Sequence, residues 1–251
     1  KRQAMEHALR TRAEELKIMG LSDATILLSS LEYDYIGEIL PEIRRYLISI
    51  VRDVPGVGAP AAGRRGAMFV GGFKHSPNTD AALFLCSEIW PRVRSRDPMA
   101  ELSIIGADVS PEIQALHDPA QGVNVVGFVE DLEPFYQSVR VNLAPLRYGA
   151  GVKGKVAASL SVGLPTVATP TAVEGMFLED GKDVLVREDP EAFAEAVVKL
   201  FRDDDLWDQL SRNAVKAAQD TFSLDAARSR LKIMLRLSLI HISEPTRQEA
   251  I

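Results

Sequence analysis

Glycines and cations gather in residues 145–155 (PLRYGAGVKGK), directly before an apolar stretch that is typical of a helix. A flexible backbone, compact cations and a following helix N-terminus suit a diphosphate, because they bring N–H groups and positive charge to its oxygens. The alternative is a solvated basic loop without a ligand. The density of glycine beside charge, in a chain with a formal net charge of −6, favours anion binding. The candidate ligands are Arg147, Gly149, Gly151, Lys153 and Lys155.

A second glycine-bearing loop, residues 71–80 (GGFKHSPNTD), leads from an expected strand into an expected helix. Gly71 and Gly72 let the backbone approach a ligand closely, and the helix offers free N–H groups to a phosphate. The same residues are also typical of a plain strand-to-helix turn in which Asn78 or Thr79 caps the helix. The loop is not GxGxxG and no suitably placed acid follows it, so a dinucleotide site has little support.

A third loop, residues 169–176 (TPTAVEGM), carries one carboxylate, Glu174, among small residues. Glu174 is a candidate acceptor of hydrogen bonds from sugar or ribose hydroxyls. Alternatively it starts a short helix, where a carboxylate is favoured by the helix dipole.

Composition excludes several classes of protein. Hydrophobic residues make up 46% and charged residues 25% of the chain, which is typical of a globular protein. The single cysteine, Cys86, excludes a secreted disulfide scaffold. We therefore expect a cytoplasmic location, either free in the cytoplasm or at the inner face of the membrane. No apolar run approaches the roughly 20 residues of a membrane span. The acidic net charge argues against nucleic acid as a partner, and the dispersed His7, His75 and His117 argue against a metal site.

Short β-rich runs alternate with helical segments from Ala67 onward, which predicts an α/β domain with a Rossmann-like, doubly wound parallel sheet. In such sheets ligands bind beyond the carboxyl ends of the strands, where the three loops lie. We expect strands at 67–71, 102–106, 123–126, 141–144, 165–168 and 184–186, and helices at 79–93, 112–116, 132–138, 152–162, 191–201, 205–220 and 223–236.

The two ends of the chain differ from this domain. Residues 1–51 contain a strand, a helix and a strand between 24 and 50, after an amphipathic helix at 1–19, and we interpret them as the truncated end of a preceding α/β domain. Glycine and proline without periodicity predict a linker at 52–66, before the main domain at 67–236. Residues 237–251 lose the helical period and include LSLIHISEPTR, which resembles a translated sequencing-library adapter, so we expect an adapter-derived scar there.

Five motifs, most of them at the ends of expected strands, occur in the order and spacing of one protein family. Together they resemble the carboxyl-terminal, donor-binding half of a bacterial glycosyltransferase of the group 1 / family 4 type with the GT-B fold. The resemblance extends from about residue 24 to about residue 235 and includes the final helices. The motifs are FVGGFKHSPNTD (69–80), VGFVEDL (126–132), APLRYGAGVKGK (144–155), GLPTVA (163–168) and VEGM (173–176).

The resemblance implies two Rossmann-like domains that face each other across a cleft, with residues 1–51 on the acceptor side. The implied reaction transfers a sugar from a nucleotide-diphosphate donor to the hydroxyl of a glycan or lipid-linked acceptor in cell-surface glycan synthesis, without a metal or other cofactor. The fragment alone is expected to be inactive. By this analogy the donor contacts are Gly71, Gly72, Arg147, Gly149, Gly151, Lys153 and Lys155, with Glu174 beside the sugar.

The chain also departs from the family pattern. Many members carry two glutamates spaced E-x7-E, and alignment on Gly163 places Ala150 and Ala158 at those positions. No catalytic residue is assigned for this reason. Two other interpretations stay open: a non-catalytic nucleotide-binding or scaffold Rossmann domain, which the lost glutamates favour, and a GT-B nucleotide-sugar epimerase, which calls for more acidic and histidine side chains than the loops contain.

Overall fold

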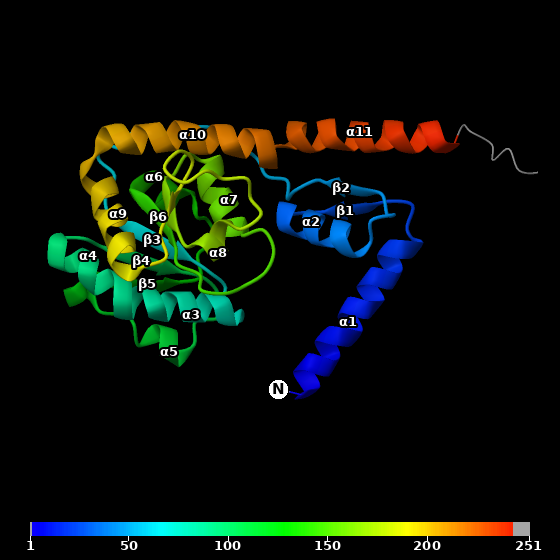
Figure 1. Cartoon of the computed structure of the whole chain (residues 1–251). Helices are drawn as coiled ribbons and strands as arrows, with labels where there is room; N and C mark the ends of the chain where they lie inside the picture. The colour runs from blue at the N-terminus through cyan, green and yellow to red at the C-terminus, as the bar shows by residue number, and fades with distance from the viewer. Residues whose placement is uncertain (1, 243–251) are drawn as a thin grey trace, which may run out of the picture.

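The computed structural model describes residues 2–242, which form a small amino-terminal unit and a larger α/β unit (Figure 1). In the small unit, α1 (Arg2–Leu21) precedes β1 (Thr25–Leu27), α2 (Ser30–Ile39) and β2 (Arg45–Leu47). β1 and β2 pair in parallel and α2 connects them. The strand–helix–strand order predicted for this region is confirmed, although β2 ends at Leu47 rather than at residue 50.

The larger unit is built on a sheet of six parallel strands in the order β5-β4-β3-β6-β7-β8. Renumbered within the sheet, this is the 3-2-1-4-5-6 order of a doubly wound fold, in which the winding reverses between β3 and β6. The predicted fold class is confirmed. The strands are β3 (Ala67–Val70), β4 (Leu102–Ile105), β5 (Val123–Gly127), β6 (Val141–Ala144), β7 (Thr166–Ala168) and β8 (Leu185–Val186).

Helices cover both faces of this sheet (Figure 1). α4 and α9 pack together on one side, and α7 and α10 pack together on the other. The helix expected at 79–93 is interrupted by a π-helical turn, η1 (Leu85–Ile89). The helices and turns are α3 (Ser76–Phe84), η1, α4 (Trp90–Arg96), α5 (Pro111–Gln114), η2 (Pro119–Gln121), α6 (Glu133–Ser138), α7 (Gly154–Ser161), α8 (Pro170–Val173), α9 (Pro190–Arg202), α10 (Asp204–Phe222) and α11 (Leu224–Ile242).

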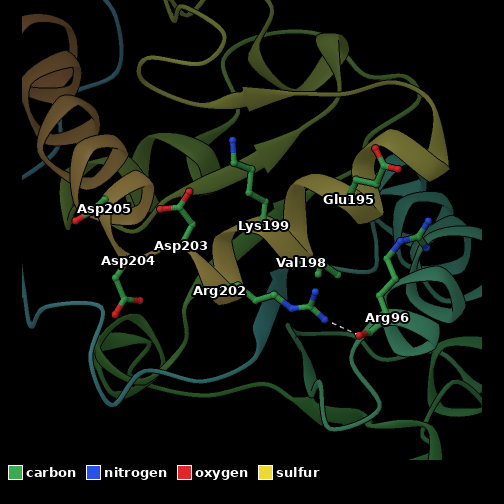
Figure 2. Close-up of a pocket in the computed structure, with 8 residues that line it drawn as sticks. All are labelled: Arg96, Glu195, Val198, Lys199, Arg202, Asp203, Asp204 and Asp205. Atoms are coloured by element: carbon green, nitrogen blue, oxygen red, sulfur yellow. Dashed lines mark hydrogen bonds between the residues drawn. The ribbon is translucent and has the colours of Figure 1, made fainter.

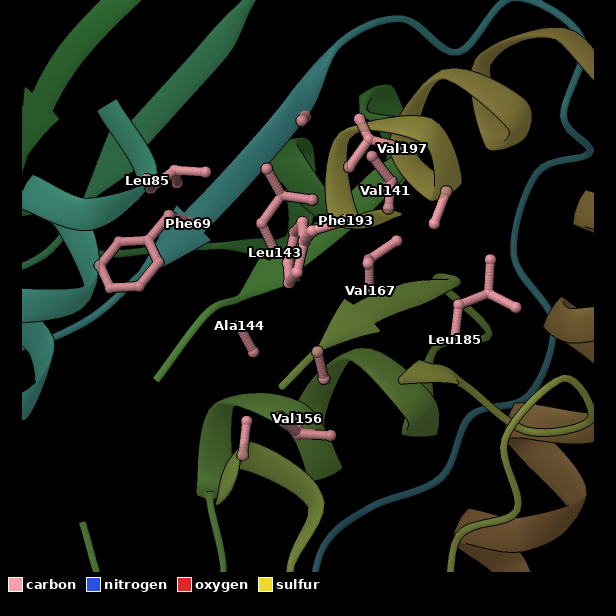
Figure 3. Packing of buried hydrophobic residues seen from close by; sticks show 14 of the residues in the cluster. Phe69, Leu85, Val141, Leu143, Ala144, Val156, Val167, Leu185, Phe193 and Val197 are labelled. Atoms are coloured by element: carbon pink, nitrogen blue, oxygen red, sulfur yellow. The ribbon is translucent and has the colours of Figure 1, made fainter. Parts of the chain in front are cut away.

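The core lies between the sheet and its helices (Figure 3). Phe69, Leu143 and Val167 on neighbouring strands are fully buried, together with Phe193 on α9. Burial of large apolar side chains is the main term that stabilises such a domain, at about 1.5–3 kcal/mol for each side chain. This rigid core fixes the positions of the loops at the strand ends.

The carboxyl-terminal helices close the larger unit and return to the small one. Asp203 caps α10 by accepting a hydrogen bond from the Leu206 N–H, as its position before a helix predicts. Trp207 is fully buried, and its indole N–H donates to the Arg140 carbonyl at 2.7 Å. α11 then runs back to contact β2 (Figure 1).

Residues 52–66 contain no helix, but they are tied to the larger unit. The Arg52 N–H donates to the Phe222 carbonyl at 2.8 Å. Arg64 is only 4% exposed and donates to the Tyr136 carbonyl at 2.5 Å. The segment predicted as a linker is therefore fixed at both ends.

The helix α11 continues beyond Arg236, where the sequence pattern predicted its end, to Ile242. The prediction that the helix ends at Arg236 is therefore wrong, since its backbone stays helical for six more residues. Residues 243–251, the rest of the expected scar, lie outside the described residues. Among residues 2–242, none of the helices is both long and apolar enough to span a bilayer.

Candidate functional site

All three loops singled out in the sequence leave the sheet at neighbouring strand ends. Residues 71–80 follow β3 and residues 145–155 follow β6, the two adjacent strands between which the winding reverses. Residues 169–176 follow β7, the next strand of the sheet. Doubly wound sheets bind their ligands beyond the carboxyl ends of strands at this reversal. We call the three loops together the switch-point site.

Lys155, in the first turn of α7, turns inward over the end of β3. Its ammonium nitrogen donates to Asn78 Oδ1 at 2.6 Å and lies 4.5 Å from the centre of the Phe69 ring. Desolvation and the nearby Lys153 lower the pKa of Lys155 to about 7. An ammonium group has three N–H donors and the Asn78 bond uses one of them. A cation held this way, at high cost in desolvation, is typical of a functional site.

Lys153 precedes α7 and folds back over its own loop. It is 8% exposed, and its ammonium donates to the carbonyl oxygens of Gly149 at 3.1 Å and Gly151 at 2.6 Å. Desolvation lowers the pKa of Lys153, while Glu174 and Glu32 act in the opposite direction. Gly149 and Gly151 have φ of +132° and +75°, values that favour glycine and let their carbonyls converge on the ammonium. The glycines and lysines of this loop therefore act as one unit.

Arg147 lies at the rim of the site rather than inside it. Its guanidinium makes a two-pronged ion pair with Asp80 of α3, with Nε at 2.9 Å from Oδ2. It also stacks 4.8 Å from the centre of the Phe84 ring, and its side chain is 53% exposed. The hydrogen bonds with Asp80 raise the pKa of Arg147. Since Asp80 already compensates this charge, the excess positive charge of the switch-point site comes from the two lysines.

Asn78 and Thr79 do not cap the first helix, so that interpretation of the loop is wrong. α3 begins at Ser76, which places both residues within its first turn. Their side chains instead donate to the carbonyls of the preceding loop, Asn78 to Gly72 at 2.9 Å and Thr79 to Phe73 at 3.2 Å. Asn78 thus joins the first loop to Lys155 of the second.

Packing explains why residue 71 is a glycine, but it does not explain the glycine at position 72. A Cβ on Gly71 would lie 2.9 Å from Asn78 Cγ, so this residue is required by packing. A Cβ on Gly72 would meet nothing closer than 3.9 Å, and one on Gly154, at the start of α7, would meet nothing within 4 Å. Protein packing therefore does not account for a glycine at position 72 or 154, since there is room for a side chain at both positions.

Glu174 follows α8 instead of starting a helix, which makes the helix-start interpretation wrong. Pro170 occupies the first position of α8, and Glu174 is the residue at its carboxyl end. A carboxylate is disfavoured by the dipole at that end of a helix. Glu174 is exposed and acts electrostatically on Lys153. The structure therefore places this carboxylate beside the cationic loop.

The small unit touches the switch-point site through α2. The Ser30 N–H donates to the Gly175 carbonyl at 3.3 Å, and a Cβ on Gly175 would lie 2.7 Å from Ser29 Cβ. Ser29 caps α2 together with Glu32, and the Glu32 carboxylate acts on Lys153. The first turn of α2 therefore forms one wall next to the lysines.

A charged cavity of about 610 Å³ lies between α4, α9 and the start of α10 (Figure 2). Arg202 donates there to the Arg96 carbonyl at 2.7 Å, and Asp203 caps α10. Helices of a doubly wound fold run opposite to its strands, so the carboxyl ends of α4 and α9 lie toward the amino ends of the strands. This cavity is therefore away from the switch-point site. Within residues 2–242, no three His, Cys, Asp or Glu side chains are grouped so as to hold a metal ion.

Residues 64–203 match the family described as glycosyl transferases group 1. The match covers more than half of the chain and includes all three loops of the switch-point site. The chain belongs to the group 1 glycosyl transferases. None of the curated proteins matches its sequence.

Solved structures of glycosyltransferases share this fold. The chain superposes on TarM of S. aureus, in complex with Fondaparinux, alpha-GlcNAc-glycerol and UDP, with a TM-score of 0.75, 15% identity and coverage of 91% of this chain and 46% of TarM. Sucrose-phosphate synthase of Thermosynechococcus elongatus gives a TM-score of 0.71 at 17% identity, with coverage of 90% of this chain and 61% of the synthase. HepE of Anabaena, in complex with UDP and glucose, gives a TM-score of 0.65 at 13% identity, with coverage of 88% of this chain and 66% of HepE. The larger unit is thus a GT-B Rossmann-like domain, and this group 1 glycosyl transferase chain spans about half the length of TarM.

Ala150 and Ala158, at which the sequence resemblance led us to expect glutamates, lie in different surroundings. Ala150 is exposed on the glycine-rich loop. Ala158 is 7% exposed and belongs to an apolar cluster with Met68, Ile105 and Leu164. An unpaired carboxylate at position 158 would be costly in that setting. Asn78 and Glu32 were not predicted to be parts of the site, because their roles depend on contacts between segments far apart in the chain.

Proposed function

We propose that this group 1 glycosyl transferase chain is the donor-binding half of an enzyme that transfers a sugar from a nucleotide-diphosphate donor to an acceptor hydroxyl in cell-surface glycan synthesis. The observation that carries the proposal is the pair of inward-turned lysines at the switch-point site. Among the structural neighbours, the structures of TarM, HepE and pneumococcal GtfA contain UDP. The acceptor is proposed to be a glycan or a lipid-linked glycan.

In the reaction, the bond between the anomeric carbon and the diphosphate oxygen breaks, and the electron pair leaves on the diphosphate. A new bond forms between the anomeric carbon and the acceptor oxygen, whose proton is released. The developing negative charge has to be stabilised where it appears, and prearranged cations achieve this at low cost in reorganisation. Lys153 and Lys155 are the residues of this chain that we assign to that role, with the start of α7 beside them.

The ligand-free environment of Lys155 suits this role. With a pKa of about 7, the residue is partly neutral at physiological pH. A bound diphosphate adds two or more negative charges nearby and favours the protonated amine. Binding would therefore draw a proton onto Lys155, and Asn78 would keep its ammonium directed at the ligand.

Glu174 is proposed to accept hydrogen bonds from the donor sugar. It is exposed and follows β7 by a few residues. It also lies near enough to Lys153 for its negative charge to oppose, in part, the desolvation that lowers the pKa of that lysine. A carboxylate at the edge of a cationic pocket suits a ligand that has a diphosphate at one end and hydroxyl groups at the other. Arg147, paired with Asp80, is proposed to hold the glycine-rich loop against α3.

A second candidate function is nucleotide binding without transfer. Ala150 and Ala158 favour it, because they stand where many family members have acids. Such a protein would bind the diphosphate through the same lysines and leave the sugar bond intact.

Calorimetry on the whole chain separates these functions. UDP, GDP and their sugars are titrated into the wild type and into Lys153→Ala and Lys155→Ala variants. Heat that both variants abolish supports the donor site, and absence of heat with every diphosphate supports a scaffold. Mass spectrometry of an added oligosaccharide then separates the two functions, since a transferase attaches the donor sugar to it and a binding protein leaves it unchanged.

A further inference from the structure

A cavity of about 450 Å³ opens on the outer side of the larger unit, between the loop that follows α8, the second half of α10 and α11. The loop begins at the switch-point site, since Phe177 follows Glu174 by three positions. We call this hollow the α10–α11 cavity. Its cations are Lys182, Lys216 and Arg230.

Two of these cations carry charge that no carboxylate compensates. Lys216 is exposed, and within the described residues it forms no ion pair. Arg230 donates only to backbone carbonyls, those of Asp220 at 3.3 Å and Thr221 at 3.5 Å. Lys182 differs, because its ammonium pairs with Glu179 at 2.8 Å. The free positive charge of the cavity therefore comes from α10 and α11.

The carboxylates that line the cavity are Asp183 and Asp220. Asp183 is 7% exposed and accepts a hydrogen bond from the Glu179 N–H at 3.0 Å, so it serves to fix the loop. Asp220 is exposed on α10. Since Glu179 pairs with Lys182, the cations of the lining that form no ion pair with another described residue are Lys216 and Arg230.

Phe177 adds an aromatic surface to this charged lining. Its φ of +58° is in the left-handed region, which is strained for a bulky residue. Its side chain is nevertheless 53% exposed instead of packed in the core. The opposite wall carries the amide of Asn213, which donates to the Lys182 carbonyl at 3.0 Å. An exposed aromatic ring held at a cost in backbone strain indicates a contact surface.

We infer that the α10–α11 cavity binds an anionic glycan, a chain whose sugars carry carboxylate, phosphate or sulfate groups. The ring of Phe177 suits the C–H face of a sugar, while Lys216 and Arg230 suit its charged groups. The loop that carries Phe177 leads away from Glu174 of the switch-point site, and the glycan would accordingly be an acceptor chain that extends from that site along this loop. That last step rests on the proposed function.

The test measures glycan binding to the whole chain by calorimetry at low salt. The probes are trigalacturonic acid, which has three carboxylates, and the neutral maltotriose as its control. The variants are Lys216→Gln with Arg230→Gln, which removes the free charge, and Phe177→Gly, which removes the ring and relieves the strained φ. Lys232→Gln, an exposed lysine on α11 outside the lining, is the matched control for loss of charge. Thermal melts establish that each variant is folded.

We expect trigalacturonic acid to bind at least tenfold more tightly than maltotriose. The double variant should weaken it at least tenfold and Phe177→Gly at least threefold, while Lys232→Gln leaves it unchanged. Equal binding of the two sugars, an unchanged affinity in the double variant, or preferential capture by phosphatidylglycerol vesicles would overturn the inference. UDP titrations on the same samples keep the two proposals apart, since the cavity variants should not alter UDP binding. If the wild-type protein binds trigalacturonic acid but no UDP, the proposed donor site is refuted and the glycan-binding cavity is not.

Discussion

Lys155 makes the affinity for UDP depend on pH in a defined direction. Without ligand its pKa is lowered to about 7 by desolvation and by Lys153. A bound diphosphate stabilises the charged amine, so the pKa rises in the complex. Affinity is therefore constant below the free pKa and falls as pH rises above it, because binding must then recruit a proton.

The size of this effect follows from the free pKa. If the bound pKa rises to about 11 or higher, the fraction of free protein with protonated Lys155 sets the apparent Kd up to pH 9. That fraction is about one half at pH 7 and about one hundredth at pH 9, for a pKa of about 7. Kd should rise by about 50-fold across this range, which is ~2.3 kcal/mol of binding free energy. The terminal phosphate of UDP, with a second pKa near 6, is already ionised at both pH values.

Calorimetry at pH 7, 8 and 9, in two buffers with different ionisation enthalpies, measures both Kd and proton uptake. We expect about half a proton taken up per UDP at pH 7 and close to one at pH 9. Lys199→Met, at an exposed lysine of α9 in the cavity that lies away from the switch-point site, should show the wild-type profile. A Kd that changes less than threefold between pH 7 and pH 9 in folded protein would refute the reasoning.

Three further changes separate ligand contacts from packing. Lys155→Met should raise the melting temperature at pH 7, measured by calorimetric scanning. The lowered pKa of Lys155 destabilises the folded state only at pH values below 10.5, the pKa of lysine in the unfolded chain, so this gain should vanish as the pH approaches 10.5. An equal gain at every pH would contradict the prediction. Gly72→Ala should weaken UDP binding at least fivefold with an unchanged melting temperature, whereas Gly71→Ala should lower that temperature; the reverse pattern would show that Gly72 serves packing. Gly175→Ala should destabilise the chain more than Gly181→Ala, because both have φ near +70° to +77° but only Gly175 abuts α2; equal urea midpoints would remove that contact from the account.

The sequence was sufficient to predict the sheet and to place the three candidate loops at one edge of it. Short apolar strands that alternate with helices allow few topologies, and parallel strands with right-handed crossovers bring the loops after β3, β6 and β7 to one edge. The glycine-rich loop was recognisable because glycine and lysine together are unusual in an acidic chain. These features are local in sequence, and the fold only assembles them.

The detailed contacts were not predictable, because they depend on which partner each side chain finds in space. Arg147 was expected to contact the diphosphate, but its ion pair with Asp80 of α3, which is 67 positions away in the chain, could not be predicted from the sequence. Asn78 was interpreted as a cap, but it bridges a loop carbonyl to Lys155. The approach of α2 to Gly175 joins two units that the sequence separates by well over 100 residues. No periodicity or composition signal carries such pairings.

The central claim is that Lys153 and Lys155 recognise a nucleoside diphosphate at the switch-point site. Its most direct test compares the affinities of UDP and UMP for the wild type and for a chain with both lysines changed to methionine. The account predicts that the wild type prefers UDP at least tenfold and that the double variant, still folded, binds the two nucleotides equally or not at all. A double variant that keeps the full preference for UDP would contradict it.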